Sequence, residues 1–303
     1  MAWGGMNLMR RSWMILLLAT ATIVVLACSL MDPGTTVVPE ANAMDAPTSP
    51  VSPPEAATQA GSEPAAAGTP FAFPGGSLVI PPGLAGGASA EIIPAVDEQS
   101  GAPWDVAPEY VKITLQGYAL EGKFFQPQLM IYPAAEYSAG SEAAAQSIQS
   151  LQTILANPSS PLDANALPHL PFANAAQVFA AQMQPMSFKS GQGVRFLTEY
   201  AQYVATINNH DLFYHFQGLT GFGEFYVVAI LPINAAFLPA ESDPASPLPA
   251  GGIPFPGYET VDEIQFDNYY SGVTDLLDRT SPDQFTPSLA SLDALIGSLE
   301  VTK

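Results

Sequence analysis

Hydrophobic and polar positions alternate in several stretches of the chain, and this period predicts β-strands. Between residues 110 and 118, Val111, Ile113 and Leu115 are apolar while the positions between them are polar. This spacing is typical of a strand with one buried face. Shorter apolar runs that end at proline predict two more strands, over residues 77–80 and 128–132.

Two hairpins are predicted in the middle of the chain, because apolar and aromatic runs flank loops that contain glycine. The first joins residues 177–188 to 194–200, and the second joins 212–217 to 225–233. With the earlier strands, these four indicate an antiparallel sheet.

Helical spacing appears in three places. Ile148, Leu151 and Leu155 form one stripe, in a helix that Ser141 caps and Pro158 ends. Two further helices are predicted over residues 260–278 and 288–299, and loops over 157–172 and 239–256. The order of elements predicts an α+β fold, with helices packed on one face of an antiparallel sheet.

The N-terminus is expected to be a targeting segment. Arg10 and Arg11 precede an apolar run of about 15 residues, as in a secretory signal peptide. The run ends Val25-Leu26-Ala27-Cys28, which resembles the lipobox of bacterial lipoproteins. The resemblance implies a signal peptide over residues 1–27 and acyl chains such as palmitate on Cys28, which would anchor the chain outside the cytoplasm. An uncleaved membrane-spanning helix over residues 14–31 is the alternative.

The segment that follows is rich in Pro, Ala, Thr and Ser and poor in large apolar residues. Such a composition cannot bury enough surface to offset its ordering entropy, so residues 28–70 are predicted to be a disordered linker. Residues 71–303 are then a single folded domain, which is long enough for one substantial core.

Charge and composition exclude several classes of function. The formal net charge is −20, with 28 acids against 8 bases, which argues against nucleic acid as a partner. The one cysteine excludes an internal disulfide and a cysteine-rich metal site. Because the chain contains no recognisable nucleophile, phosphate-loop or metal motif, no cofactor, metal or catalytic residue is predicted.

Aromatic residues crowd the second hairpin, and from it we select Phe213, His215 and Phe222 as a possible binding surface, together with Arg195, an isolated base in the first hairpin. Side chains alternate along a strand, so core packing is the competing interpretation for most of them. Tyr214 and Phe216 would share one face of the sheet, whereas Phe213 and His215 would share the other. Arg195 is alternatively an internal ion-pair partner.

The overall layout of lipobox, linker and one domain, with the segment that runs from Asn208 to Thr220, resembles uncharacterised bacterial surface lipoproteins. The run Leu78-Val79-Ile80-Pro81-Pro82-Gly83-Leu84 also resembles the opening of PsbP-like α/β/α sandwiches. Neither resemblance supplies a catalytic residue.

Two functions remain open, and a third, a solute-binding lipoprotein, ranks below them because hinged binding proteins usually need two lobes and only one domain is predicted. The first is a non-enzymatic lipoprotein that binds a protein or glycan or assists envelope assembly. The second is an extracytoplasmic hydrolase or carbohydrate-active protein, with carboxylates among Glu199, Asp211 and Glu224. The second hypothesis predicts two acids that face each other in a pocket beside exposed aromatic side chains.

Overall fold

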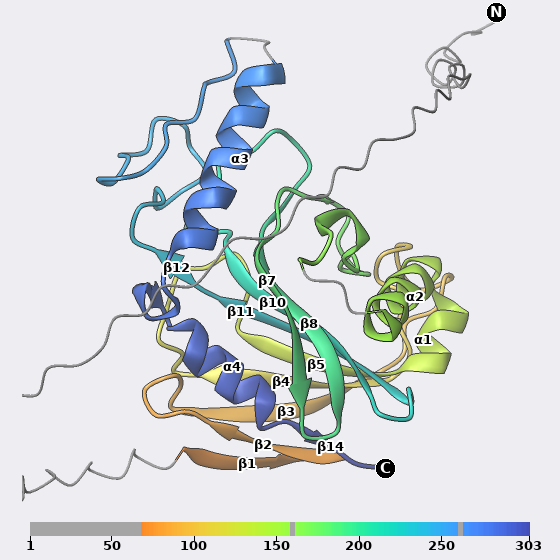
Figure 1. Ribbon diagram of the computed structural model, residues 1–303. Coiled ribbons are helices and arrows are strands. Elements are labelled where there is room, and N and C mark those ends of the chain that lie inside the picture. The colour runs from red at the N-terminus through yellow and green to blue at the C-terminus, as the bar shows by residue number, and fades with distance from the viewer. Residues whose placement is uncertain (1–67, 158–160, 260–262) are drawn as a thin grey trace, which may run out of the picture. The chain divides into compact units, whose positions relative to one another are not determined.

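A seven-stranded antiparallel sheet lies at the centre of this computed structural model, which describes residues 68–157, 161–259 and 263–303 (Figure 1). From edge to edge the strands are β3 (Gly87–Ile93), β4 (Tyr110–Gln116), β5 (Gln128–Pro133), β11 (Phe225–Pro232), β10 (Phe213–Thr220), β8 (Gly191–Thr198) and β7 (Ala181–Phe188). Both predicted hairpins form, as β7–β8 and β10–β11.

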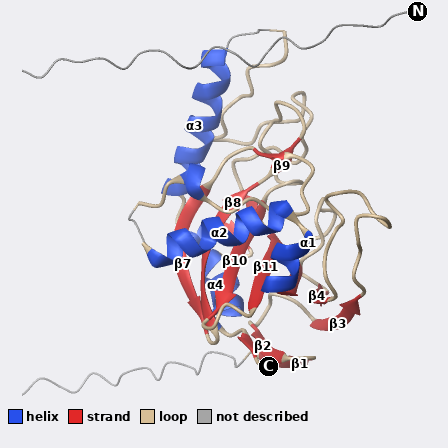
Figure 2. Ribbon diagram, turned by 90° about the vertical axis from the view of Figure 1, so that its right-hand side faces the viewer, coloured by secondary structure: helices blue, strands red, loops and turns tan. Residues whose placement is uncertain are grey.

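Helices cover both faces of this sheet (Figures 1 and 2). α1 (Ala134–Gly140) and α2 (Glu142–Ala156) pack on one face, and α3 (Glu263–Arg279) and α4 (Leu289–Gly297) pack on the other. The α+β class is confirmed, but the prediction that helices cover one face alone was wrong. The physical reason is that every residue of β10 and nearly every residue of β11 is buried, so each of these strands needs a cover on both sides.

The two faces have separate apolar cores, and β10 contributes to both. Tyr214 and Phe216 pack with Leu292 of α4, while Phe213 packs with Leu151 of α2. The alternation predicted along this strand is therefore confirmed. Ser141 also caps α2 as expected, because its side chain accepts a hydrogen bond from the backbone N–H of Ala144.

Shorter elements complete the fold. β2 (Gly76–Ile80) lies between β1 (Thr69–Phe73) and β14 (Glu300–Val301) in a small separate sheet. Because β1 starts at Thr69, the folded domain begins slightly before the boundary predicted at residue 71. Two-residue strands pair as β6 (Ala176–Gln177) with β9 (Tyr200–Ala201), and as β12 (Asn234–Ala235) with β13 (Phe285–Thr286). Single 3₁₀ turns are η1 (Ala164–Ala166) and η2 (Pro282–Gln284).

The predicted signal peptide, Cys28 and almost all of the predicted linker lie outside the described residues. Within residues 68–303, apart from the two short gaps, no helix has the length and hydrophobicity needed to cross a bilayer.

Candidate functional site: an acidic cleft with aromatic walls

A cleft of about 660 Å³ lies where β8 ends and β10 begins. Loops that are far apart in the sequence form its walls. Trp104 comes from the β3–β4 loop, Phe124 from the β4–β5 loop, and Tyr203 from the loop that leads into β10. These three rings are 43%, 64% and 59% exposed, so they present a large apolar area to solvent. Exposed aromatic side chains that gather at one cleft are typical of a ligand site.

Polar side chains complete the lining of the cleft. Its acids are Glu199, Asp211 and Glu241, and neutral polar groups come from Asn174, Gln202 and Ser242. Neither lysine nor arginine occurs among the described residues that line it. The cleft therefore offers carboxyl groups and aromatic faces, but no side chain with a permanent positive charge.

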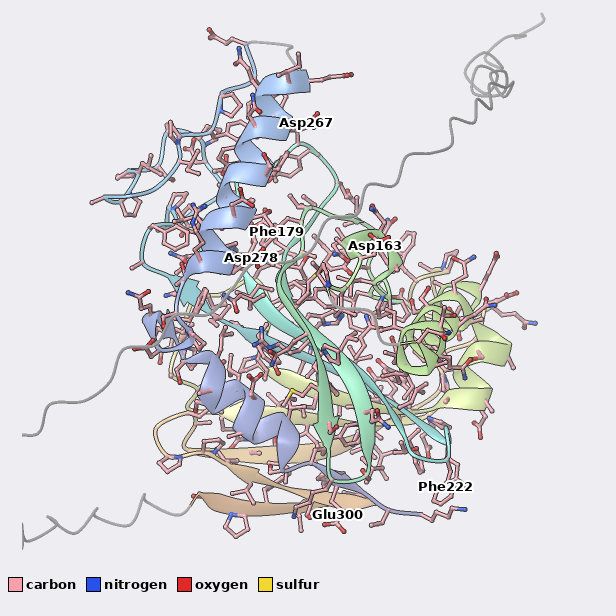
Figure 3. All side chains as sticks on the ribbon, viewed as in Figure 1. Asp163, Phe179, Phe222, Asp267, Asp278 and Glu300 are labelled. Atoms are coloured by element: carbon pink, nitrogen blue, oxygen red, sulfur yellow. The ribbon has the colours of Figure 1, made fainter. Side chains whose placement is uncertain are left out.

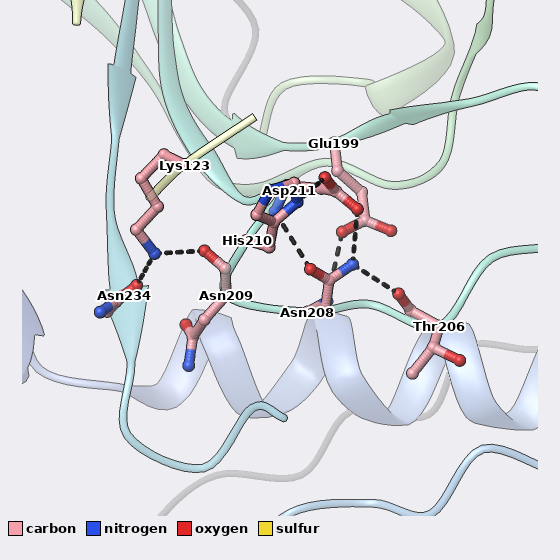
Figure 4. Close-up of polar contacts among 8 residues, drawn as sticks. All are labelled: Lys123, Glu199, Thr206, Asn208, Asn209, His210, Asp211 and Asn234. Atoms are coloured by element: carbon pink, nitrogen blue, oxygen red, sulfur yellow. Dashed lines mark hydrogen bonds and ion pairs between the residues drawn. The ribbon is translucent and has the colours of Figure 1, made fainter. Parts of the chain in front are cut away.

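Asn208 holds two of these acids together (Figure 4). Its backbone N–H donates to Oε2 of Glu199 at 3.3 Å, and its side-chain amide donates to Oδ2 of Asp211 at 2.9 Å. The same amide also donates to the carbonyl of Thr206, and its oxygen accepts the backbone N–H of Asp211. Because Asn208 is fully buried and all its polar atoms are paired, it fixes both carboxyl groups at the base of the cleft.

Glu199 is the most unusual group in this network. It is only 1% exposed, and its Oε1 has no hydrogen-bond partner among the described residues. Burial raises the pKa of Glu199 well above its ordinary value, and the nearby charge of Asp211 acts in the same direction. The hydrogen bond from Asn208 opposes this shift without cancelling it. Glu199 therefore keeps its proton up to a higher pH than an exposed glutamate does.

Asp211 and His210 form a second pair, in which Nδ1 of His210 lies 2.7 Å from Oδ1 of Asp211. Since a carboxylate only accepts hydrogen bonds, Nδ1 carries the hydrogen. The ring of His210 packs edge-on against Phe124, with centroids 6.1 Å apart, and the His210 carbonyl accepts the backbone N–H of Phe124. These contacts hold the aromatic wall of the β4–β5 loop against the polar base of the cleft.

Lys123 lies near the cleft but is not part of its lining. Its Nζ donates to the backbone carbonyl of Asn209 and to the side chain of Asn234 (Figure 4). Burial lowers the pKa of Lys123, while the charges of Glu241 and Asp211 partly oppose that shift. Its ammonium group is thus already engaged by two oxygen acceptors.

Three of the four residues selected from the sequence as a binding surface are buried in the sheet. Phe213 and His215 are fully buried and Arg195 is almost fully buried, so none of them can contact a ligand from solvent. The physical reason for the error is the helical cover on both faces, which turns the two sides of β8 and β10 into core.

His215 belongs to a closed internal network. Its Nδ1 donates to the carbonyl of Ala229, and its Nε2 lies 2.7 Å from the amide nitrogen of Gln217. Gln217 also accepts a hydrogen bond from the hydroxyl of Tyr226 and donates to the carbonyl of Pro168. Burial lowers the pKa of His215 to about 3, so this histidine is neutral and structural.

Arg195 is the internal ion-pair partner that the sequence suggested as an alternative. Its Nε lies 3.3 Å from Oδ1 of Asp293 on α4, and its guanidinium also donates to the carbonyl of Gln182. The hydroxyl of Tyr214 donates to the same carboxylate oxygen of Asp293 at 2.9 Å. These bonds tie the sheet to α4.

Phe222 (Figure 3) and Glu224 lie in the β10–β11 turn, and neither is among the residues that line the cleft. Phe222 is 89% exposed, and Nζ of Lys303 is 5.9 Å from the centre of its ring. The carboxylate of Glu224 lies 2.6 Å from the same Nζ. Of the three acids that sequence reasoning considered, the fold therefore brings together Glu199 and Asp211 and leaves Glu224 elsewhere.

Within the described part of the chain, no group of three or more His, Cys, Asp or Glu side chains is arranged to hold a metal ion. The chain matches no known protein-family model, no curated protein and no solved structure, so its kinship to surface lipoproteins and to PsbP-like sandwiches stays a prediction.

Proposed function

We propose that this protein is an extracytoplasmic lipoprotein, anchored to the cell membrane through acyl chains on Cys28, whose folded part binds a small organic ligand in the aromatic cleft. The lipobox and the Pro- and Ala-rich segment after it support the anchor and its tether. A tether of about 40 residues can extend up to about 130 Å, which lets the cleft sample a large volume around the membrane.

The observation that carries the binding function is the cleft itself. Three exposed rings surround a base where Asn208 holds the buried Glu199 and the partly exposed Asp211. Exposing large aromatic side chains to water has no benefit for folding, whereas a ligand that covers them removes apolar area from solvent. Polar groups held in fixed positions at the base of the cleft would orient the ligand, as is typical of small-molecule sites.

Thermal unfolding of the full chain in detergent tests this proposal. The probe panel comprises neutral oligosaccharides, amino acids and alkyl amines, each added to the wild type and to a Phe124→Ser/Tyr203→Ser variant. At 100 times its dissociation constant, a ligand stabilises the folded state by about 2.7 kcal/mol. We expect at least one class to raise the melting temperature of the wild type and not that of the variant. If every class shifts both proteins equally or not at all, the proposal fails.

A hydrolase is the second candidate, and one observation favours it. Two carboxyl groups in different environments, the buried Glu199 with its raised pKa and the partly exposed Asp211, share one cleft, as a general acid and a base would. Release of reducing ends from polysaccharides by the wild type, abolished in Glu199→Gln, would establish hydrolysis in place of simple binding.

A further inference from the structure

The charge of the cleft restricts the chemistry of its ligand. Among the described residues that line it, Glu199, Asp211 and Glu241 are acids and none is lysine or arginine. An anionic ligand would meet carboxylates without a compensating cation, which is strongly unfavourable at a site partly shielded from water. The whole chain carries a net charge of −20, so long-range attraction also favours cations.

The aromatic walls favour the same class of ligand. A ring attracts a cation placed over its face, and tryptophan does so most strongly. Trp104, Phe124 and Tyr203 expose their rings, and the lining has three more rings, those of Phe125, Phe172 and Tyr200. Rings and carboxyl groups together therefore suit a positively charged organic molecule with a carbon chain.

The unpaired oxygen of Glu199 supplies an independent observation. Buried polar atoms nearly always have a hydrogen-bond partner, so an unpaired one needs an explanation. The described residues contain two unpaired buried side-chain oxygens, Oε1 of Glu199 and Oγ1 of Thr206, and both residues are hydrogen-bonded to Asn208 through other atoms. Glu199 is one of the residues that line the cleft, so a ligand in the cleft is the donor that we assign to its buried Oε1 once the carboxyl group is ionised.

We propose that the ligand of the cleft is a protonated amine, whose ammonium group donates hydrogen bonds to Glu199 and Asp211 while its carbon chain lies against the exposed rings. This inference rests on the binding function proposed above. A quaternary ammonium would satisfy the rings but has no N–H for the unpaired oxygen. A neutral sugar would leave the acidic charge of the cleft uncompensated.

Binding of an amine also moves a proton. The ammonium replaces the proton on Glu199: the carboxyl O–H breaks, its proton passes to the buffer, and the carboxylate accepts an N–H from the ligand. Besides Asp211, the titratable groups that interact electrostatically with Glu199 are Tyr269 and Tyr270 on α3. Burial raises the pKa of both tyrosines, that of Tyr270 to about 12, so neither competes for the proton near neutrality.

Fluorescence titration gives the first test. In the full chain with Trp3→Phe and Trp13→Phe, Trp104 is the remaining tryptophan and reports on the cleft directly. The probes are 1,5-diaminopentane, its uncharged analogue 1,5-pentanediol, and maltotriose. We expect the diamine to give a saturable change that weakens as salt is raised, and the diol to give none. If the diol or maltotriose binds as tightly as the diamine, or the diamine does not bind, the inference is overturned, while binding of either neutral probe still supports the proposed function.

Glu199→Gln gives the second test, with Glu224→Gln as the matched control because Glu224 lies outside the cleft lining. Loss of a hydrogen bond to a charged group is expected to weaken diamine binding about 10- to 100-fold in Glu199→Gln. Calorimetry at pH 7 in phosphate and in Tris should show proton release of up to one per diamine bound in the wild type, and none in the variant. Equal affinities in the two chains, or binding without proton release, would contradict the role assigned to Glu199.

Discussion

The buried acid Glu199 makes the stability of this protein depend on pH in a direction that can be measured. Its pKa is raised in the folded state, whereas in the unfolded chain it returns to its ordinary value of 4.5. Above pH 4.5 the unfolded chain loses this proton and the folded chain keeps it, so rising pH favours unfolding. The free energy of unfolding should fall by about 1.4 kcal/mol per pH unit, until the pH reaches the folded-state pKa. At pH 4 and below, Glu199 contributes no such loss.

Glu199→Gln removes this dependence and keeps the size of the side chain. The amide oxygen of the new residue can still accept the N–H of Asn208, which Glu199 accepts at 3.3 Å. We therefore expect the variant to gain stability relative to the wild type by about 1.4 kcal/mol for each pH unit above 4.5, over the same window. The gain should be absent at pH 4, where the two side chains are both neutral.

Urea unfolding of the two chains at pH 4, 5, 6 and 7, followed by circular dichroism, measures this difference. Groups that titrate in both proteins cancel to first order when the two curves are subtracted. Glu224→Gln is the control, because Glu224 is partly exposed and its ion pair with Lys303 should contribute less than about 1 kcal/mol. A difference between wild type and Glu199→Gln that stays constant from pH 4 to 7 would show that Glu199 is not a buried neutral acid.

Three other changes test separate parts of the structure. Gln217→Leu leaves the hydroxyl of Tyr226 and Nε2 of His215 unpaired in the core, so urea unfolding should show a loss of about 3 kcal/mol or more; a loss below about 1 kcal/mol would contradict the network. Phe222→Ser should alter stability by less than about 0.5 kcal/mol in the same assay, because that ring is 89% exposed. Cys28→Ser should abolish acylation and lipobox processing, measured by mass spectrometry of membrane extracts; unchanged processing and membrane association would favour the uncleaved helix.

Much of the central fold could be predicted from the sequence, because its strands and helices carry strong periodic patterns. β4 alternates, β10 and β11 flank a glycine-containing turn, and α2 has a serine cap and an apolar stripe. The edge strand β3 was missed because its sequence, Gly-Ala-Ser-Ala-Glu-Ile-Ile, contains small residues and is largely exposed. α1 was also missed, since it has seven residues and no side-chain cap.

The layering of the helices was predicted incorrectly although the sequence contained the relevant signal. Tyr226-Val227-Val228-Ala229-Ile230-Leu231 is a continuous apolar run, which is typical of a strand buried on both faces. Placing every helix on one face of the sheet left the other face of this strand without a cover. The same error placed Phe213 and His215 on a binding surface.

The cleft could be predicted only in part. Glu199 and Asp211 were among the three acids considered, but nothing local in the sequence separates them from Glu224. What joins them is Asn208, which reaches both carboxyl groups through a folded loop. The aromatic walls were missed because Trp104, Phe124 and Tyr203 lie on separate loops, whose positions depend on tertiary packing. Their signal was the presence of large rings in otherwise polar or glycine- and proline-rich segments.

The stability cost of Glu199 and the chemistry of the cleft have one physical cause. A buried carboxyl group with an unpaired oxygen destabilises the folded chain at neutral pH, and a glutamine of the same shape would avoid that cost. The fold nevertheless holds Glu199 firmly, through Asn208 and beside Asp211. Binding of a cation in the cleft would offset this destabilisation, since the cation stabilises the ionised carboxylate and donates a hydrogen bond to its unpaired oxygen. In Glu199→Gln the proton release and the contribution of this residue to the pH dependence of unfolding should therefore disappear together, and amine binding should weaken, whereas a purely structural role for Glu199 would leave amine affinity unchanged.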